Sequence, residues 1–375
     1  TIEALDEYTV KFTLKAPNAA FLGTLTSNYG AIVDKDVIAE NGDLMRADGG
    51  TGPFMLGEWL PDNYVELPKF EDYRGDVKLD GITYYLIGDE GARLAALRTG
   101  EIDIANLSSA NVTAAEAEEN LEVISYQTNN YLAMGCNLST PALQDKNVRQ
   151  AMSYALDRQA IINVVYNGQA VVSSMMPPAM GHWALDVSTM DLYQTNVEKA
   201  KSLMEAAGYN ENNRLTLKLA AGLMDAIRQA AVVIQQQLSE IYIDVEITNL
   251  ESGEYVDIWG KMSTPEAGFD LMVVHDGAGT DPNRAISFFF GTGSSANVFG
   301  FTNERVDELC ALGISTTDEA QREEYYNEAQ EICIDDCSKL CIASPMNYFV
   351  ASTRLQGFAP SAANASDFRD AYFAE

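Results

Sequence analysis

The sequence has little of what catalytic or membrane-embedded proteins need. Its 375 residues include only two histidines and three tryptophans, and basic residues are scarce. Neither histidine, His182 or His275, lies near a cysteine or in a Gly-x-Ser-x-Gly turn, so nothing supports acyl-transfer chemistry. No apolar run reaches the roughly 18 residues that a membrane-spanning helix requires. We therefore expect neither an enzyme nor a transmembrane protein.

The five cysteines are too few and too scattered for a zinc site or a dense disulfide framework. Cys333, Cys337 and Cys341 follow one another at intervals of four residues. Side chains at this spacing on one helix run parallel, which makes them poor disulfide partners. The favoured interpretation is small buried apolar residues, with a Cys337–Cys341 bridge at a helix–strand junction as the open alternative. We expect no metal and no cofactor.

The chain is strongly acidic. It has 55 aspartates and glutamates against 24 lysines and arginines, a formal charge of −31. Such a field repels nucleic-acid phosphates and anionic bilayers, so we expect neither as a partner.

Apolar residues recur at strand and helix periods along most of the chain. Successions of strand, helix and strand predict an α/β fold, and the run 269–274, apolar except for Asp270, is typical of a central parallel strand. The expected helices are 89–99, 111–118, 196–207, 225–240, 251–261, 303–313 and 317–336. The expected strands are 8–14, 55–60, 64–68, 82–86, 101–105, 121–126, 215–220, 242–247, 340–343 and 347–351.

The most informative stretch is a predicted pair of amphipathic helices at residues 143–168. Asp145 stands where an N-cap is expected, and Gly168 ends the second helix. The letters of residues 145–158, DKNVRQAMSYALDR, resemble the D-x-x-V-R-Q-A-(L/M)-x-Y-A-(I/L)-D-R signature of the extracytoplasmic solute-binding proteins, family 5, of peptide and nickel ABC importers.

Further stretches resemble motifs of the same family. Residues 93–103 are similar to R-x-x-A-L-x-x-G-E-I-D, residues 196–209 to D-x-E-K-A-K-x-L-L-x-E-A-G-Y, and residues 50–54 to a G-T-G-P-(Y/F) turn. The resemblance implies a two-lobed periplasmic-binding-protein-like α/β fold (type II, cluster C), with mixed sheets flanked by helices. It places residues 1–128 in lobe I, 129–352 in lobe II and 353–375 in a return segment, and it implies that lobe I is incomplete.

The function implied by the resemblance is that of the substrate-binding subunit of an ABC importer. Its lobes would close on an oligopeptide and deliver it to a membrane permease. The alternatives are a non-peptide solute, such as a metal chelate or a glycan, and a solute sensor without transport. The family also implies an extracytoplasmic monomer, in the periplasm or as a cell-surface lipoprotein.

The expected ligand-binding segment is 275–283, HDGAGTDPN, directly after the apolar strand. In peptide-binding members of the family that this chain resembles, the matching segment reads like W-(G/C)-A-D-x-x-D-P, and its first aspartate pairs with the α-amine of the peptide. That aspartate falls on Ala278 or Gly279 here, so the carry-over fails in strict register. Either Asp276 or Asp281 substitutes for it, or the segment is a glycine-rich turn. The predicted ligand-binding residues are Asp276, Asp281, His275, Gly277, Asn137 and Trp259.

Overall fold

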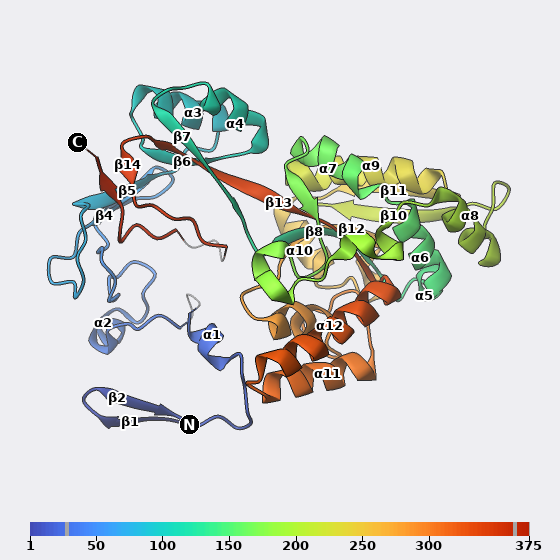
Figure 1. Ribbon diagram of the computed structural model, residues 1–375, viewed down its shortest axis with the longest axis horizontal. Helices are drawn as coiled ribbons and strands as arrows, with labels where there is room; N and C mark the ends of the chain where they lie inside the picture. Colours follow the sequence, from blue (N-terminus) through green and yellow to red (C-terminus); the bar gives the residue numbers. More distant parts are fainter. Residues whose placement is uncertain (27–29, 363–365, 375) are drawn as a thin grey trace. The chain divides into compact units, whose positions relative to one another are not determined.

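The computed structural model describes residues 1–26, 30–362 and 366–374 (Figure 1). The chain forms two compact units. Unit 1 comprises Thr1–Gly23 and Asn129–Pro345, and unit 2 comprises Thr24–Thr128 and Met346–Glu375. The expected lobes differ from these units at residues 1–23 and 346–352, and as functional lobes they stay a prediction.

Unit 1 is built on a mixed sheet. Its strands are β8 (Asn130–Cys136), β9 (Ala170–Val172), β10 (Leu215–Ala221), β11 (Ile243–Asn249), β12 (Leu271–Gly277) and the first half of β13 (Lys339–Ser352). Their order is β11–β10–β12–β8–β13, and β9 also pairs with β13. β10 is parallel to β11 and β12, whereas β8 is antiparallel to β12 and β13. The central apolar strand β12 is therefore parallel to one neighbour and antiparallel to the other, as the prediction of mixed sheets implies.

The sheet of unit 1 is buried on both faces because successive side chains of a strand point to opposite sides. In β8, Leu132 and Met134 pack into one apolar cluster, while Tyr131 and Ala133 pack into the other. β12 shows the same division, so residues 271–274 need to be apolar throughout.

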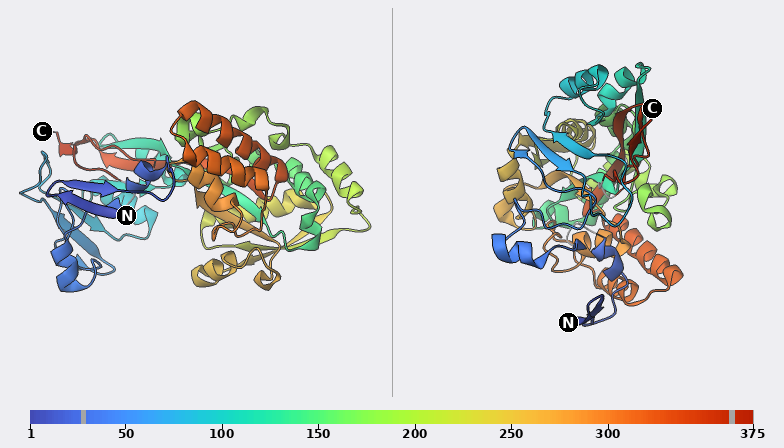
Figure 2. Two further views of the ribbon diagram at one scale, coloured as in Figure 1. Left: turned by 90° about the horizontal axis from the view of Figure 1, so that it is seen from below. Right: turned by 90° about the vertical axis from the view of Figure 1, so that its left-hand side faces the viewer.

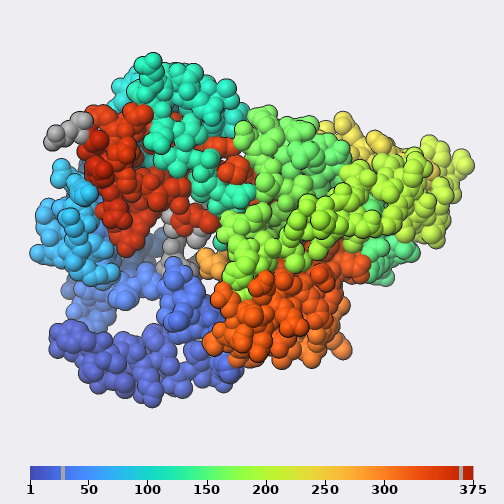
Figure 3. Space-filling view, viewed as in Figure 1, coloured from blue at the N-terminus to red at the C-terminus, as the bar shows by residue number. Residues whose placement is uncertain are grey.

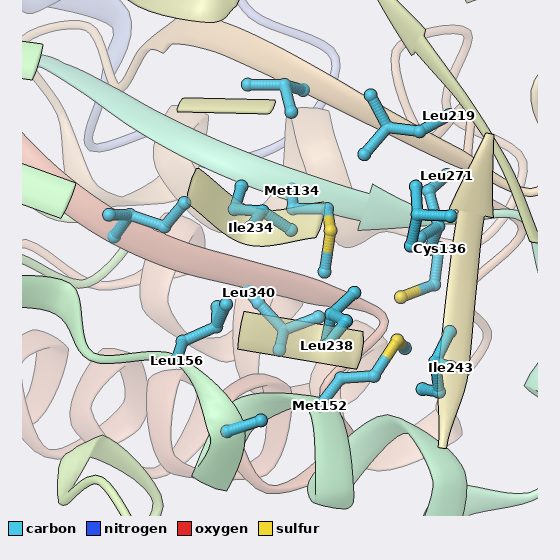
Figure 4. Close-up of a cluster of buried hydrophobic side chains, with 14 of the residues drawn as sticks. Met134, Cys136, Met152, Leu156, Leu219, Ile234, Leu238, Ile243, Leu271 and Leu340 are labelled. Atoms are coloured by element: carbon cyan, nitrogen blue, oxygen red, sulfur yellow. The ribbon is translucent and has the colours of Figure 1, made fainter. Parts of the chain in front are cut away.

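Helices cover both faces of this sheet. One face is covered by α5 (Pro141–Gln144), α6 (Lys146–Ala155), α7 (Arg158–Tyr166), α8 (Val197–Ala206) and α9 (Asp225–Ser239). The other face carries α10 (Ser252–Trp259), α11 (Glu304–Ser315) and α12 (Glu319–Asp336). Figure 4 shows the first cluster, in which Met152, Ile234 and Leu340 meet from a helix, a second helix and a strand.

α11 and α12 lie lengthwise against each other (Figures 1 and 2). Their outer faces form a continuous orange surface in the space-filling view (Figure 3). Short 3-10 or π turns connect the longer elements: Pro178–Trp183, Val187–Thr189, Asp191–Tyr193, Pro265–Ala267 and Arg284–Phe288.

The helix pair behind the family signature forms as expected. The side chain of Asp145 accepts a hydrogen bond from the Asn147 amide and caps α6, and Asp157 caps α7 through the Ala160 amide. Between them, the buried guanidinium of Arg158 donates to the carbonyls of Cys341 and Ser153, which ties the helices to β13. The polar letters of the motif are therefore structural, since they satisfy buried backbone groups.

Unit 2 has smaller sheets. Its elements are α2 (Lys35–Asn41), β3 (Trp59–Leu60), β4 (Tyr64–Pro68), β5 (Gly81–Tyr85), α3 (Glu90–Thr99), β6 (Ile104–Leu107), α4 (Ser109–Glu116), β7 (Leu121–Gln127), β14 (Leu355–Gln356) and β15 (Tyr372–Phe373). β3, β4 and β5 form one sheet, β14 pairs with β15, and β6 and β7 pair with the second half of β13. α1 (Phe21–Leu25) contains the junction of the two units.

Two strand predictions are wrong in detail. The expected strands 340–343 and 347–351 are one strand, β13, because Pro345 pairs with Ala170 of β9 and the ladder continues past it. A proline donates no amide hydrogen, but it is tolerated where its missing donor is not needed. The expected strand 8–14 is present as β2 (Thr9–Phe12), and it forms a hairpin with β1 (Ile2–Asp6), a strand that the sequence did not predict.

Within the described ranges, no helix is both long enough and apolar enough to cross a lipid bilayer.

Candidate functional site

The candidate site is the carboxyl end of β12 and the turn that follows it. The amide of Ala278 donates to the Asn129 carbonyl at 2.7 Å, and the Asn129 side-chain amide donates to the Gly279 carbonyl at 2.5 Å. Asn129 is the residue at which the chain enters unit 1 for the second time. The turn is therefore held at the start of β8.

Asp276 forms a buried ion pair with Lys339, the first residue of β13. Their side chains are only 11% and 4% exposed. The Lys339 ammonium also lies 4.1 Å from the centre of the Phe289 ring and 3.4 Å from the Tyr131 hydroxyl. Burial, with a smaller contribution from Asp276, raises the pKa of Tyr131 well above its usual value, so the phenol stays neutral. The negative charge of Asp276 is thus already balanced from within the chain.

Asp281 is also paired. Both of its carboxylate oxygens accept from one nitrogen of Arg322 on α12, at 2.8 and 3.0 Å. Asp281 also accepts from the Asn283 amide at 2.9 Å, which closes the turn in the way aspartates commonly do. Burial lowers the pKa of the Arg322 guanidinium, but the hydrogen bonds and the charge of Asp281 raise it, and the net pKa is above its usual value. Asp281 therefore joins the turn to α12.

His275 and Gly277 belong to β12 itself. Gly277 pairs with Asn130 of β8, and a Cβ at this glycine would lie 3.0 Å from the Asn130 side-chain oxygen. Burial lowers the pKa of the His275 imidazole below its ordinary value, and the neighbouring Asp276 offsets only part of this effect. The imidazole is therefore neutral near pH 7.

The other two predicted residues lie elsewhere in unit 1. Asn137 follows the far end of β8, and its buried amide donates to the carbonyls of Thr264 and Phe269 at 3.0 Å each. Asn137 is seven positions after Asn130, which corresponds to about 23 Å along a strand. Trp259 ends α10 and packs, half-buried, on the second apolar cluster. The structure therefore brings together His275, Asp276, Gly277 and Asp281 but not Asn137.

Comparison with known proteins supplies the wider context for this geometry. Residues 1–298 match the family model described as bacterial extracellular solute-binding proteins, family 5. The chain belongs to this family. The oligopeptide-binding protein AppA of Bacillus subtilis is 27% identical over an alignment of 382 positions, which covers 96% of this chain and 69% of that protein. The glutathione-binding protein GsiB of Pectobacterium atrosepticum is 27% identical over an alignment of 386 positions, which covers 100% of this chain and 74% of that protein.

Comparison with solved structures agrees with the fold. The ABC transporter-associated periplasmic binding protein DppA from Helicobacter pylori, solved with the peptide STSA, superimposes with a TM-score of 0.84 at 26% identity. The match covers 100% of this chain and 74% of that one. The predicted family membership, the α/β binding-protein fold, the solute-binding function and the extracytoplasmic location are confirmed by these matches.

The site contains three cations that sequence reasoning missed: Lys339, Arg322 and Arg284. Lys339 is 63 residues from Asp276 in sequence and Arg322 is 41 from Asp281, so no local pattern links the partners. A basic residue directly before an apolar run, as Lys339 stands before Leu340–Ile342, is a usable signal, because a buried ammonium needs an acidic partner.

We found no support for metal or thiol chemistry in the described ranges. No group of three or more histidine, cysteine, aspartate or glutamate side chains there is placed to hold a metal ion. All five cysteines are buried free thiols, so the Cys337–Cys341 bridge is not formed. Burial raises the pKa of both thiols to about 12. The interpretation as small buried residues is confirmed.

Proposed function

We propose that this chain binds an oligopeptide reversibly, releases it unchanged, and presents it to the permease of an ABC importer. The observation that carries the proposal is the family match over residues 1–298, joined to a relative named for oligopeptide binding and a structural neighbour solved with a peptide. Closing of two lobes on the solute belongs to this proposal. So do the monomeric state and the lipid anchor.

The end of β12 is the proposed contact region for the solute. It follows a strand of the parallel part of the sheet, and ligands of α/β proteins commonly bind beyond the carboxyl ends of such strands. Micromolar affinity requires about −8 kcal/mol. Three or four charge-assisted hydrogen bonds, at roughly 1.5–3 kcal/mol each, supply this once the costs of association are offset by apolar burial.

Within this region, we propose that Asp276 and Asp281 position other groups. Each carboxylate already holds a cation of the chain, Lys339 or Arg322, so a ligand amine has to compete with a tethered partner. His275, Gly277 and Trp259 remain proposed contacts.

A non-peptide solute is the second candidate. It is favoured by one observation: the position expected to carry an amine-binding aspartate is Ala278 or Gly279, and the acids on either side, Asp276 and Asp281, are both paired. A solute without a free amine needs no such aspartate. A sensing role without transport has the same binding step and differs only in the membrane partner.

Native mass spectrometry of the chain purified from a bacterial host tests the proposal. We expect an adduct of a few hundred daltons, lost on denaturation, whose fragments are those of a peptide. A fragmentation pattern without amino-acid residues favours the second candidate. A preparation that neither carries a solute nor is stabilised against heat by a mixed tri- to pentapeptide pool contradicts the peptide proposal.

A further inference from the structure

Charge is distributed unevenly at the end of β12. Asp276 is neutralised by Lys339, and Asp281 is neutralised by Arg322. His275 is neutral because burial lowers its pKa. Within residues 275–284, these pairings leave one formal charge that is not balanced, the positive charge of Arg284. In the described part of the chain, no carboxylate forms an ion pair with Arg284, although acidic residues outnumber basic ones by 55 to 24.

The backbone is shaped to place the Arg284 side chain. Gly279 has a φ of +78°, and a Cβ there would lie 2.5 Å from Cδ of Arg284 and 3.1 Å from its Nε. The Arg284 side chain therefore passes over Gly279 and occupies the space that the Cβ of any other residue would need. The carbonyl of the same glycine accepts from Asn129. Gly279 thus needs to be glycine for two reasons, its positive φ and the close approach of Arg284.

An aromatic ring supports the guanidinium from another side. Cζ of Arg284 lies 4.4 Å from the centre of the Phe288 ring, one turn further along the chain. Phe288 is 38% exposed, and Arg284 is exposed as well. A guanidinium that stacks through its face keeps the N–H donors of its edge free, and these donors match the two oxygens of a carboxylate.

Asn129, which is hydrogen-bonded to this turn, carries an unsatisfied buried acceptor. Asn129 is 7% exposed, and its side-chain oxygen has no hydrogen-bond partner in the described residues, although its amide nitrogen is bonded to Gly279. Unpaired buried acceptors are rare, and a bound molecule or an ordered water commonly satisfies them. This acceptor and the unpaired cation both adjoin Gly279.

We propose that Arg284 is the anchor for a carboxylate of the solute, with Gly279 and Phe288 as the residues that position it. The proposal rests on the proposed solute-binding function and adds the charge of the group that unit 1 recognises. The overall charge of −31 does not prevent such binding, because at physiological ionic strength charges beyond about 8 Å are largely screened.

Pairs of peptides that differ only at the carboxyl terminus test the proposal. The ligand-stripped chain is titrated by calorimetry with peptides from a tri- to pentapeptide pool, each as the free acid and as the amide. We expect the acid to bind at least tenfold more tightly. Arg284→Gln should abolish this preference, and Arg284→Lys should retain part of it because the charge stays but the fork is lost.

The matched control is Arg354→Gln. Arg354 is also exposed, and its guanidinium lies 5.7 Å from the ring centre of Phe373, but it belongs to unit 2 and is remote in sequence from β12. This variant should keep the preference for the acid. Gly279→Ala should reduce the preference without removing the charge, which separates a positioning role from general electrostatics.

Two outcomes overturn the proposal: equal affinity of the wild-type chain for acid and amide, or an unchanged preference in Arg284→Gln. If no peptide binds, the peptide proposal fails on its own, and small carboxylates decide the inference. Acetate, succinate and citrate are then compared with their amides by thermal shift. Stabilisation by an acid that is lost in Arg284→Gln supports the anchor, and no stabilisation by any of the three overturns it.

Discussion

The buried Lys339–Asp276 pair gives the sharpest stability prediction. Replacing Lys339 by methionine keeps most of the side-chain volume but leaves the Asp276 carboxylate, 11% exposed, without its partner. Removing one member of a buried ion pair typically costs about 3–5 kcal/mol, because the remaining charge stays desolvated. At roughly 2–4 °C per kcal/mol for a unit of this size, we expect the melting temperature of Lys339→Met to fall by about 6–20 °C.

Replacing the other partner, Asp276, should lower the free energy of unfolding by less. In Asp276→Asn the ammonium of Lys339 keeps its position 4.1 Å from the Phe289 ring centre, and a desolvated cation–π contact contributes about 2 kcal/mol. The double variant removes both charges, so it should be more stable than Lys339→Met alone by about 2 kcal/mol. The order of stability of the three variants therefore tests the contribution of the aromatic ring beside Lys339 as well as that of the ion pair.

Denaturant unfolding followed by tryptophan fluorescence measures these differences in unit 1. Trp183 and Trp259 lie in unit 1 and Trp59 in unit 2, so a Trp59→Phe background confines the signal to the unit that holds the pair. A cost below 1 kcal/mol for Lys339→Met would refute the reasoning. So would a double variant no more stable than Lys339→Met.

Three further predictions concern the core, the site and the thiols. A Cβ at Gly135 of β8 would lie 2.0 Å from the Phe299 ring, so Gly135→Ala should lower the free energy of unfolding by about 1–3 kcal/mol. The control is Gly253→Ala on α10, where an added Cβ meets no atom within 4 Å and the substitution should be neutral or stabilising. Urea titration measures both changes. His275 has a lowered pKa in the folded chain, so the unfolded chain binds more protons and stability should fall as pH drops below about 6.5; His275→Gln should flatten this dependence in melting curves from pH 7 to 5. The five buried thiols should react with a thiol reagent only on unfolding, and a native protein with fast-reacting thiols would contradict their burial.

Local patterns predicted most of the regular elements of unit 1. Asp145 and Asn196 stand at N-caps as expected, and β10, α9 and β11 begin and end within two residues of their predicted limits. Cap side chains and apolar periodicity act over a few residues, so one sequence contains the information. The family motifs added the binding-protein fold, which periodicity alone does not specify.

Long-range pairing explains what the sequence did not predict. The antiparallel contact of β12 with β8 joins residues more than 130 positions apart, and the continuity of β13 depends on β9 alongside Pro345. The same applies to the site. Asp276 and Asp281 look like free ligand-binding acids in sequence, and only the fold brings Lys339 and Arg322 to them.

Equilibrium dialysis of the ligand-stripped chain against an equimolar peptide library, with mass spectrometry of both compartments, tests solute binding most directly. The account predicts that a subset of peptides accumulates beside the protein, up to one molecule per chain, and that every peptide is recovered intact. Even distribution of all peptides and other small solutes between the compartments, or the appearance of cleavage products, would contradict it.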